Sequence, residues 1–146
     1  MSAVSSSARS EVAVFVTRRD GGEVLLLRRV PDGGGYWHVV AGALEAGESA
    51  REAAARELEE ETGLVAALGD ALQIVEHVDP RTLLPAHPST SGVAVPITCF
   101  RAAAPADWEP LLEAEHDAHR WCPPPEAADA LVWPETAQAL RTLCAR

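Results

Sequence analysis

The sequence predicts an α/β or α+β sandwich in which helices cover a mixed β-sheet. The chain has 146 residues, of which 47% are apolar and 23% charged, as in one ordinary globular domain. Apolar runs with strand and helix spacing follow one another in the order β-β-β-α-β-β-β-α, and the connections are short except at residues 79–92. We therefore expect a single domain over residues 11–146, after a disordered Ser- and Ala-rich tail over residues 1–10.

The first three predicted strands lie before the helix. Residues 11–17 and 24–29 are β-prone runs joined by a D-G-G turn, which is a common hairpin signal. The P-D-G-G-G segment at 31–35 is a predicted loop, and Tyr36–Val40 is a short β-prone run that leads directly into Ala41 and Gly42.

A helix is predicted between Ser49 and Gly63. Ser49 and Glu52 have the spacing of a capping box, the interior is rich in alanine, and Gly63 is placed to end the helix.

The second half of the chain predicts three further strands and one or two closing helices. The strands are expected over residues 72–78, 93–101 and 118–122, and the helices over 126–133 and 134–146. Pro96 indicates an edge position or a bulge. The long loop at 79–92 is where we expect substrate selection to reside.

The charge of the chain excludes several kinds of function. The net charge is −10, from 12 basic and 22 acidic residues, so we expect no stable complex with nucleic acid. All basic residues are arginine, which excludes lysine chemistry and leaves bidentate binding of phosphate or carboxylate.

The cysteines and the hydropathy pattern give a second set of exclusions. Cys99, Cys122 and Cys144 are widely spaced without a C-x-x-C pair, so we interpret them as buried free thiols. No apolar run approaches the about 18 residues of a membrane span, and the N-terminus has no signal-peptide core. We therefore predict a cytoplasmic protein without a membrane partner.

The stretch R-E-L-E-E-E-T-G at residues 56–63 concentrates like charge on the predicted helix. At about 100° per residue, Glu57, Glu60 and Glu61 share one face about 100° wide, whereas Glu52 and Glu59 point away from it. Converging carboxylates raise one another's pKa unless a dication neutralises them, and hard oxygen ligands favour Mg²⁺ or Mn²⁺. The sequence therefore predicts a site for one of these ions, with backbone carbonyls of the preceding glycine loop in reach.

Residues 42–64 resemble the signature of the Nudix (MutT-like) hydrolase family, G-x5-E-x7-R-E-U-x-E-E-x-G-U, where U is a bulky aliphatic residue. All nine specified positions match. The resemblance implies a Nudix-type α/β/α sandwich and Mg²⁺-dependent hydrolysis of a nucleoside diphosphate linked to another group. Water attacks phosphorus in such a reaction, and no covalent nucleophile is needed.

The resemblance also implies roles for residues in and around this signature, which is called the Nudix box. Glu57, Glu60 and Glu61 match the metal-binding glutamates, Arg56 the arginine that orients one of them, Glu48 the supporting acid, and the carbonyl of Ala41 or Gly42 a backbone metal ligand. The predicted catalytic residues are Arg56, Glu57, Glu60 and Glu115.

Glu115 enters this set because Glu115 to Trp121 resembles the E-x5-W segment of the family's dihydroneopterin triphosphate and dATP pyrophosphatases. Glu115 is predicted as an additional metal ligand or general base, with Glu113 as the alternate. An exposed loop acid without a catalytic role is an equally good interpretation of Glu115.

The substrate remains open among small nucleotides and nucleoside diphosphate derivatives. A P-K-G entry to the box, typical of diadenosine polyphosphate hydrolases, is absent, and the E-x5-W likeness favours a (deoxy)nucleoside or pterin triphosphate. Pro80 lies 16 residues after Leu64, a spacing that resembles ADP-ribose or ADP-sugar pyrophosphatases, which remain the alternative substrate class. A Nudix-fold nucleotide sensor without turnover is the alternative from another class, and the sequence leaves homodimer formation undecided.

Three residues are candidates for substrate binding. Arg28 and Arg29 end a strand and are suited to a phosphate, although strand-end arginines usually lie on the surface. Trp37 and its neighbour Tyr36 can stack on a base, although packing in the core is the better interpretation of both. The histidines lack an H-x3-H pair and are predicted not to bind metal.

Overall fold

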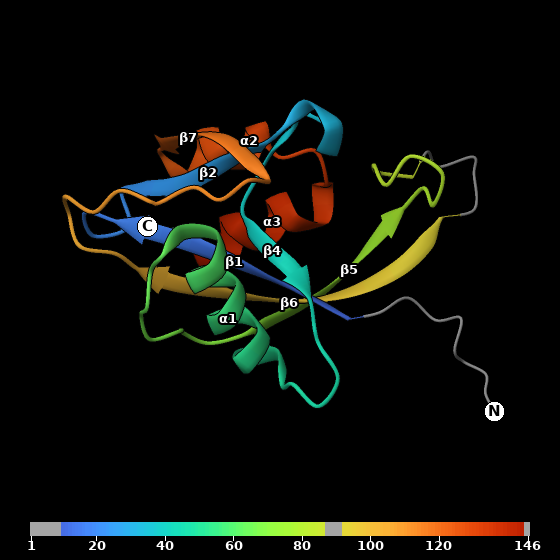
Figure 1. Cartoon of the computed structure of the whole chain (residues 1–146), viewed down its shortest axis with the longest axis horizontal. Coiled ribbons are helices and arrows are strands. Elements are labelled where there is room, and N and C mark those ends of the chain that lie inside the picture. The colour runs from blue at the N-terminus through green and yellow to red at the C-terminus, as the bar shows by residue number, and fades with distance from the viewer. Residues whose placement is uncertain (1–9, 87–91, 145–146) are drawn as a thin grey trace.

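A computed structural model describes residues 10–86 and 92–144, which form a mixed seven-stranded sheet with helices on both faces (Figure 1). The strands are β1 (Glu11–Arg18), β2 (Glu23–Arg29), β3 (Trp37–His38), β4 (Val40–Ala43), β5 (Leu72–Val78), β6 (Val93–Ala103) and β7 (His116–Cys122). The helices are α1 (Ala50–Thr62), α2 (Pro124–Ala130) and α3 (Pro134–Leu143), with a 3-10 turn at Pro31–Gly33. The predicted fold class is confirmed.

Strand β1 is the centre of the sheet, and one of its edges is divided between two partners. Along its other edge it pairs in parallel with β6. On the divided edge, residues 11–14 pair with β4 and residues 17–18 pair with β2, both antiparallel. Strand β2 then continues into pairs with β7 and β3. On this edge, β4 therefore pairs with the start of β1 and β2 pairs with its end.

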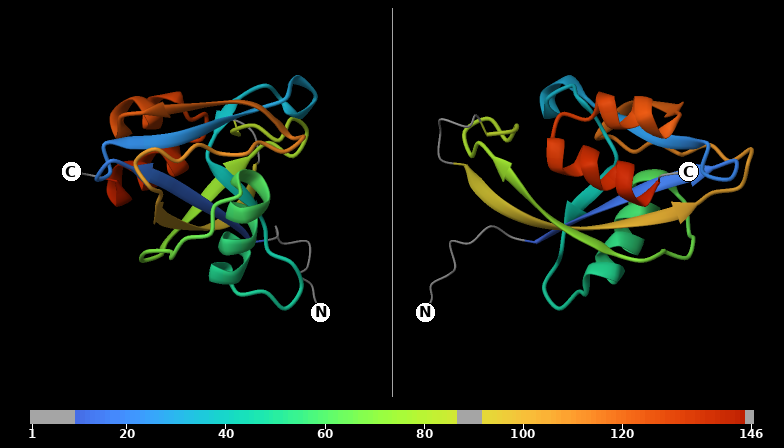
Figure 2. Two further views of the ribbon diagram at one scale, coloured as in Figure 1. Left: turned by 60° about the vertical axis from the view of Figure 1, so that its left-hand side comes forward. Right: turned by 180° about the vertical axis from the view of Figure 1, so that it is seen from behind.

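Alternate residues of β1 fill two apolar cores, one on each face of the sheet. Val12, Val14 and Val16 pack with α1, including Ala54 and Leu58. On the other face, the side chains of β1 pack with α2 and α3, which lie together against the sheet (Figure 2). The molecule is thus a three-layer α/β/α sandwich.

Helix α1 begins and ends as its sequence predicts. Both hydrogen bonds of the capping box between Ser49 and Glu52 are present, and Gly63 ends the helix in the left-handed conformation with φ of 82°. Ala54 and Leu58 are fully buried against the sheet, while Glu52 and Glu59 are exposed. The predicted capping of this helix is confirmed.

The predicted strand at Tyr36–Val40 is two strands instead of one. Strand β3 pairs with β2, and after Val39 the chain changes partner, so that β4 pairs with β1. The interruption follows from the separation of β1 and β2, because one straight strand cannot pair with both.

The other boundaries differ from the prediction by a few residues. Strand β7 begins at His116, two residues before the predicted start at 118, and α2 begins at Pro124 because a helix accepts proline in its first turn. Pro96 lies where β6 pairs only with β5, just before β1 joins at Ile97.

Two predictions fall on parts of the chain with no description. Of the predicted tail, only Ser10 is among the described residues, and residues 87–91 of the long loop also lie outside them. Within the described ranges, no helix has the length and apolar character required to cross a membrane.

Candidate active site

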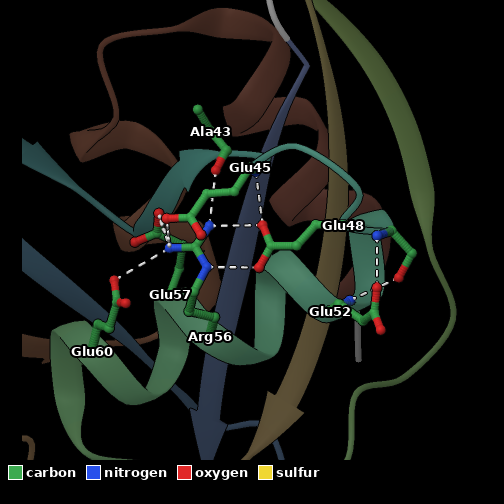
Figure 3. Close-up of polar contacts among 8 residues, drawn as sticks. Ala43, Glu45, Glu48, Glu52, Arg56, Glu57 and Glu60 are labelled. Atoms are coloured by element: carbon green, nitrogen blue, oxygen red, sulfur yellow. Dashed lines mark hydrogen bonds and ion pairs between the residues drawn. The ribbon is translucent and has the colours of Figure 1, made fainter.

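The guanidinium of Arg56 connects helix α1 to the loop that precedes it (Figure 3). Its Nε and Nη2 donate to the two carboxylate oxygens of Glu48 at 2.7 and 2.9 Å, and Nη2 also donates to the carbonyl of Ala43 at 3.0 Å. This bidentate pair lowers the pKa of Glu48 to about 2. Glu48 in turn accepts from the backbone N–H of Glu45 at 2.8 Å, so the loop and the helix are held together.

The third nitrogen of the same guanidinium contacts the predicted metal-binding face. Nη1 of Arg56 donates to Glu57 at 3.2 Å and to Glu60 at 3.3 Å. Arg56 therefore orients two of the three predicted carboxylates and sets the position of each relative to Glu48.

Glu57 and Glu61 form a carboxyl pair beside strand β4. The side chain of Glu61 is buried, and its pKa is raised to about 10, first by burial and then by the hydrogen bond to Glu57 and the negative charge of Glu57. A hydrogen bond from the backbone N–H of Ala41 opposes this shift. A buried carboxyl group hydrogen-bonded to a second carboxyl group, as Glu61 is, keeps its proton unless a cation takes its place.

Gly42 packs directly against this pair. A Cβ atom at this position would overlap the carboxylate of Glu57. Gly42 is therefore needed for close approach of the backbone to the acid, which is a use of glycine that does not involve its conformational freedom.

Glu60 lies on the same helix face, and its carboxylate accepts from the Arg56 nitrogen that also bonds Glu57. Its side chain is 58% exposed, compared with 14% for Glu57. Among the described residues, no three side chains of His, Cys, Asp or Glu come together at metal-binding distance. The donors that already converge are the Glu57 and Glu61 carboxyl groups beside the Ala41 and Gly42 backbone.

The two acids of the E-x5-W region have different surroundings. Glu115 is 62% exposed, and its carboxylate lies 3.4 Å from Nη1 of Arg29. Glu113 bonds the ring of His116 and accepts from the backbone N–H of Glu115, and its negative charge adds to the raised pKa of Glu61. Of the two acids, the alternate residue Glu113 is thus the one whose charge contributes to the raised pKa of Glu61.

A cleft of about 500 Å³ has Glu61, one member of the carboxyl pair, in its wall, whereas Glu57 is not among its lining residues. Glu61, Ala41, Gly42 and Arg29 line it, whereas Arg28 and Trp37 do not. Its lining also includes polar and aromatic side chains, those of Glu11, Tyr36, His38, Glu76, His116 and Trp133.

The two other predicted substrate-binding residues contact each other outside the cleft lining. Arg28 forms an ion pair with Asp117 at 2.9 Å, and its guanidinium lies 5.7 Å from the centre of the Trp37 ring. Arg120 lies over the same ring at 5.3 Å. Trp37 is a packing residue, as the sequence favours, but its neighbour Tyr36 faces the cleft.

Sequence reasoning missed Glu76, His38 and Trp133 as cleft residues. Burial raises the pKa of Glu76 to about 8, with further contributions from the charges of Glu135 and Glu11. Burial lowers the pKa of His38 to about 4. Glu76 could have been noticed as the one acid in the apolar run L-Q-I-V-E-H-V.

The cysteines lie in the core and are inert. Cys99, Cys122 and Cys144 are buried free thiols. Burial raises the pKa of Cys99 to about 12 and that of Cys144 to about 11, so neither is a thiolate at neutral pH.

Comparison with known proteins gives similarities in both sequence and structure. The chain is 32% identical over 120 residues to a CTP pyrophosphohydrolase of Escherichia coli, covering 80% of this chain and 78% of that protein. It is 42% identical over 125 residues to an octanoyltransferase of Myxococcus xanthus, covering 82% of this chain but 32% of that protein. The chain therefore spans about a third of the length of this second relative.

A solved structure and a family model agree with the arrangement described above. The fold is similar to that of a dihydroneopterin triphosphate pyrophosphohydrolase of E. coli, with a TM-score of 0.74 and 23% identity, covering 94% of this chain and 97% of the other. The model of the NUDIX domain matches residues 8–143. The chain belongs to the Nudix family of hydrolases, which act on phosphoanhydride bonds.

Proposed function

We propose that this chain is a Mg²⁺- or Mn²⁺-dependent pyrophosphohydrolase that cleaves a nucleoside diphosphate linked to a further group. The proposed substrate is a (deoxy)nucleoside triphosphate or a related small molecule. The observation that carries the proposal is the Glu57–Glu61 carboxyl pair: Glu61 lines the cleft, and the absence of a side chain at Gly42 lets Glu57 approach the backbone of β4.

The donors present suit a hard divalent cation. Glu57 and Glu61 would hold it, together with Glu60 and a backbone carbonyl of Ala41 or Gly42, because oxygen ligands of this kind are those that Mg²⁺ and Mn²⁺ prefer. The raised pKa of Glu61 agrees with this assignment, since it results first from burial and then from the neighbouring Glu57 carboxyl group, and a bound cation would offset both. When bound, such a cation neutralises the diphosphate and assists the attack of water on phosphorus.

The other residues of the site have positioning and proton-transfer roles in this proposal. Arg56 fixes the carboxylates of Glu57 and Glu60, and Glu48 fixes Arg56. Arg29 lines the cleft and can pair with a phosphate oxygen. We assign Glu115 as the acid that takes the proton of the attacking water, with Glu113 as the alternate.

The family relatives support nucleotides as the substrate class. One relative in sequence is a CTP pyrophosphohydrolase, and one in structure is a dihydroneopterin triphosphate pyrophosphohydrolase. The likeness to the octanoyltransferase gives little support for acyl transfer, because covalent acyl transfer needs a reactive nucleophile. This chain has no lysine, and its cysteines are buried.

The experiment is a substrate panel with Mg²⁺ or Mn²⁺. The panel contains the nucleoside triphosphates, dihydroneopterin triphosphate, ADP-ribose and dinucleotide polyphosphates, and release of the mononucleotide or pterin monophosphate is measured. We expect turnover of a triphosphate that stops when the metal is chelated. Turnover of ADP-ribose alone would replace the proposed substrate by an ADP-sugar. Saturable binding without turnover of any compound would make the chain a nucleotide sensor.

A further inference from the structure

The cleft contains buried polar atoms that the protein itself does not satisfy. In the described part of the chain, five buried side-chain nitrogen or oxygen atoms lack a hydrogen-bond partner. Four of them belong to residues that line the cleft: Arg29 Nε, His38 Nδ1, Glu76 Oε2 and Trp133 Nε1. Each such atom costs about 1–3 kcal/mol of desolvation. Their concentration around one cavity indicates a ligand that supplies the missing partners.

Glu76 is the one carboxyl group among these four residues. It is 5% exposed, and it lies on β5 on the side of the sheet covered by α3. The charges that act on it, those of Glu135 and Glu11, are both negative. A buried carboxyl group whose charged neighbours are also acidic destabilises the protein, so it has no structural benefit to explain its presence.

The side chains around Glu76 in the cleft favour a flat ligand. Tyr36, His38 and Trp133 contact one another edge to face, with ring centres 5.0 to 6.1 Å apart. Trp133 is 6% exposed, and its indole N–H is one of the unpaired groups. Aromatic walls with a few polar atoms are typical of sites for planar heteroaromatic rings.

We propose that Glu76 and Trp133 bind the base of the substrate, and that Glu76 is the residue that determines which base is preferred. Glu76 accepts a hydrogen bond from an exocyclic amino group, and the indole N–H of Trp133 donates to a ring nitrogen or carbonyl oxygen. This inference rests on the proposed function, because the diphosphate lies at Glu57 and Glu61 while the base lies farther along the same cleft. The substrate class is then the nucleotides whose base has an amino group beside an acceptor.

The test compares bases that differ at the amino group. Binding of the α,β-methylene analogues of CTP and UTP, and of GTP and ITP, is measured by calorimetry with Mg²⁺. The comparison is made at pH 9, above the pKa of Glu76 of about 8, where the carboxylate only accepts. We expect the amino member of at least one pair to bind about tenfold or more tightly than its partner, because a polar site rejects an analogue that leaves it unpaired.

Two substitutions at Glu76 separate recognition from a structural role. In Glu76→Gln the amide both donates and accepts, so the base without the amino group should bind as well as the base with it. In Glu76→Leu both members should fall to the same lower affinity. Trp133→Phe should weaken both members of the pair equally. The matched control is Gln73→Leu, an exposed position of β5 outside the cleft, which should leave the preference unchanged.

Several outcomes would overturn the inference. Equal binding of both members of both pairs by the unaltered protein would do so, as would a preference that survives in Glu76→Leu. Tight binding of ADP-ribose without discrimination in either pair would assign this part of the cleft to a sugar. Because binding is measured without turnover, the two proposals fail separately. A preference that depends on Glu76 can persist even if no nucleotide is hydrolysed.

Discussion

The protein should lose stability as the pH rises toward alkaline values, and Glu76→Gln should remove a large part of that loss. Burial raises the pKa of Glu76 from 4.5 to about 8. Between these values the folded protein keeps a proton that the unfolded chain releases, so the free energy of unfolding falls as the pH rises toward 8. Each pKa unit corresponds to about 1.4 kcal/mol, which gives a total of about 5 kcal/mol above pH 8.

The comparison between pH 6 and pH 9 isolates this contribution. At pH 6 the pH is about 1.5 units above the ordinary pKa, so about 2 kcal/mol is already lost, and about 3 kcal/mol should be lost between pH 6 and pH 9. The free energy of unfolding of Glu76→Gln should not show this part of the decrease between pH 6 and pH 9. Glu61 also has a raised pKa, but it is present in both proteins and cancels in the difference.

The assay is urea unfolding of the metal-free protein and of Glu76→Gln at several pH values. The buried amide has its own cost, so the difference in slope is the readout and the absolute stability is not. If both proteins lose the same free energy of unfolding between pH 6 and pH 9, Glu76 is ionised in the fold at neutral pH and the reasoning is refuted.

Three further predictions concern helix α1 and its entry loop. Gly42→Ala in β4 should lower kcat about 100-fold or more in the triphosphate assay, because the added methyl group displaces the adjacent carboxylate; Ala46→Ser, exposed in the loop between β4 and α1, should not. Glu60→Gln should lower kcat by about 100-fold with an unchanged melting temperature, whereas Glu59→Gln, on the opposite face, should match the unaltered enzyme. Ser49→Ala should cost about 1 kcal/mol in urea unfolding through loss of the helix cap, and an equal stability would contradict the role of the capping box.

Local signals account for the part of the fold that the sequence predicts well. The start and end of α1 depend on Ser49, Glu52 and Gly63, which act on their own backbone within a few residues. The break at Val39 depends on which strands β3 and β4 pair with, and no local signal contains that information.

The candidate site shows the same division between local and distant information. The spacing of Glu57 and Glu61 places both on one helix face, and their contact in the structure follows from it. Arg28 and Arg29 are adjacent on β2, where successive side chains point to opposite faces. Only the position of β2 in the sheet decides that Arg29 lines the cleft. The position of Glu76 could not be predicted either, because it lies outside the signature in sequence and only the fold brings it to the same cavity.

The divided edge of β1 has a consequence for the redesign of this enzyme. Where β4 replaces β2 as its neighbour, residues 11–13 and 41–42 form part of the cleft wall, whereas Glu76 and Trp133 extend from separate elements. The half of the cavity proposed for the diphosphate is thereby fixed by main-chain pairing, and the half proposed to select among bases is made of exchangeable side chains. Preference for one nucleotide over another should be adjustable without disturbing the machinery that cuts it.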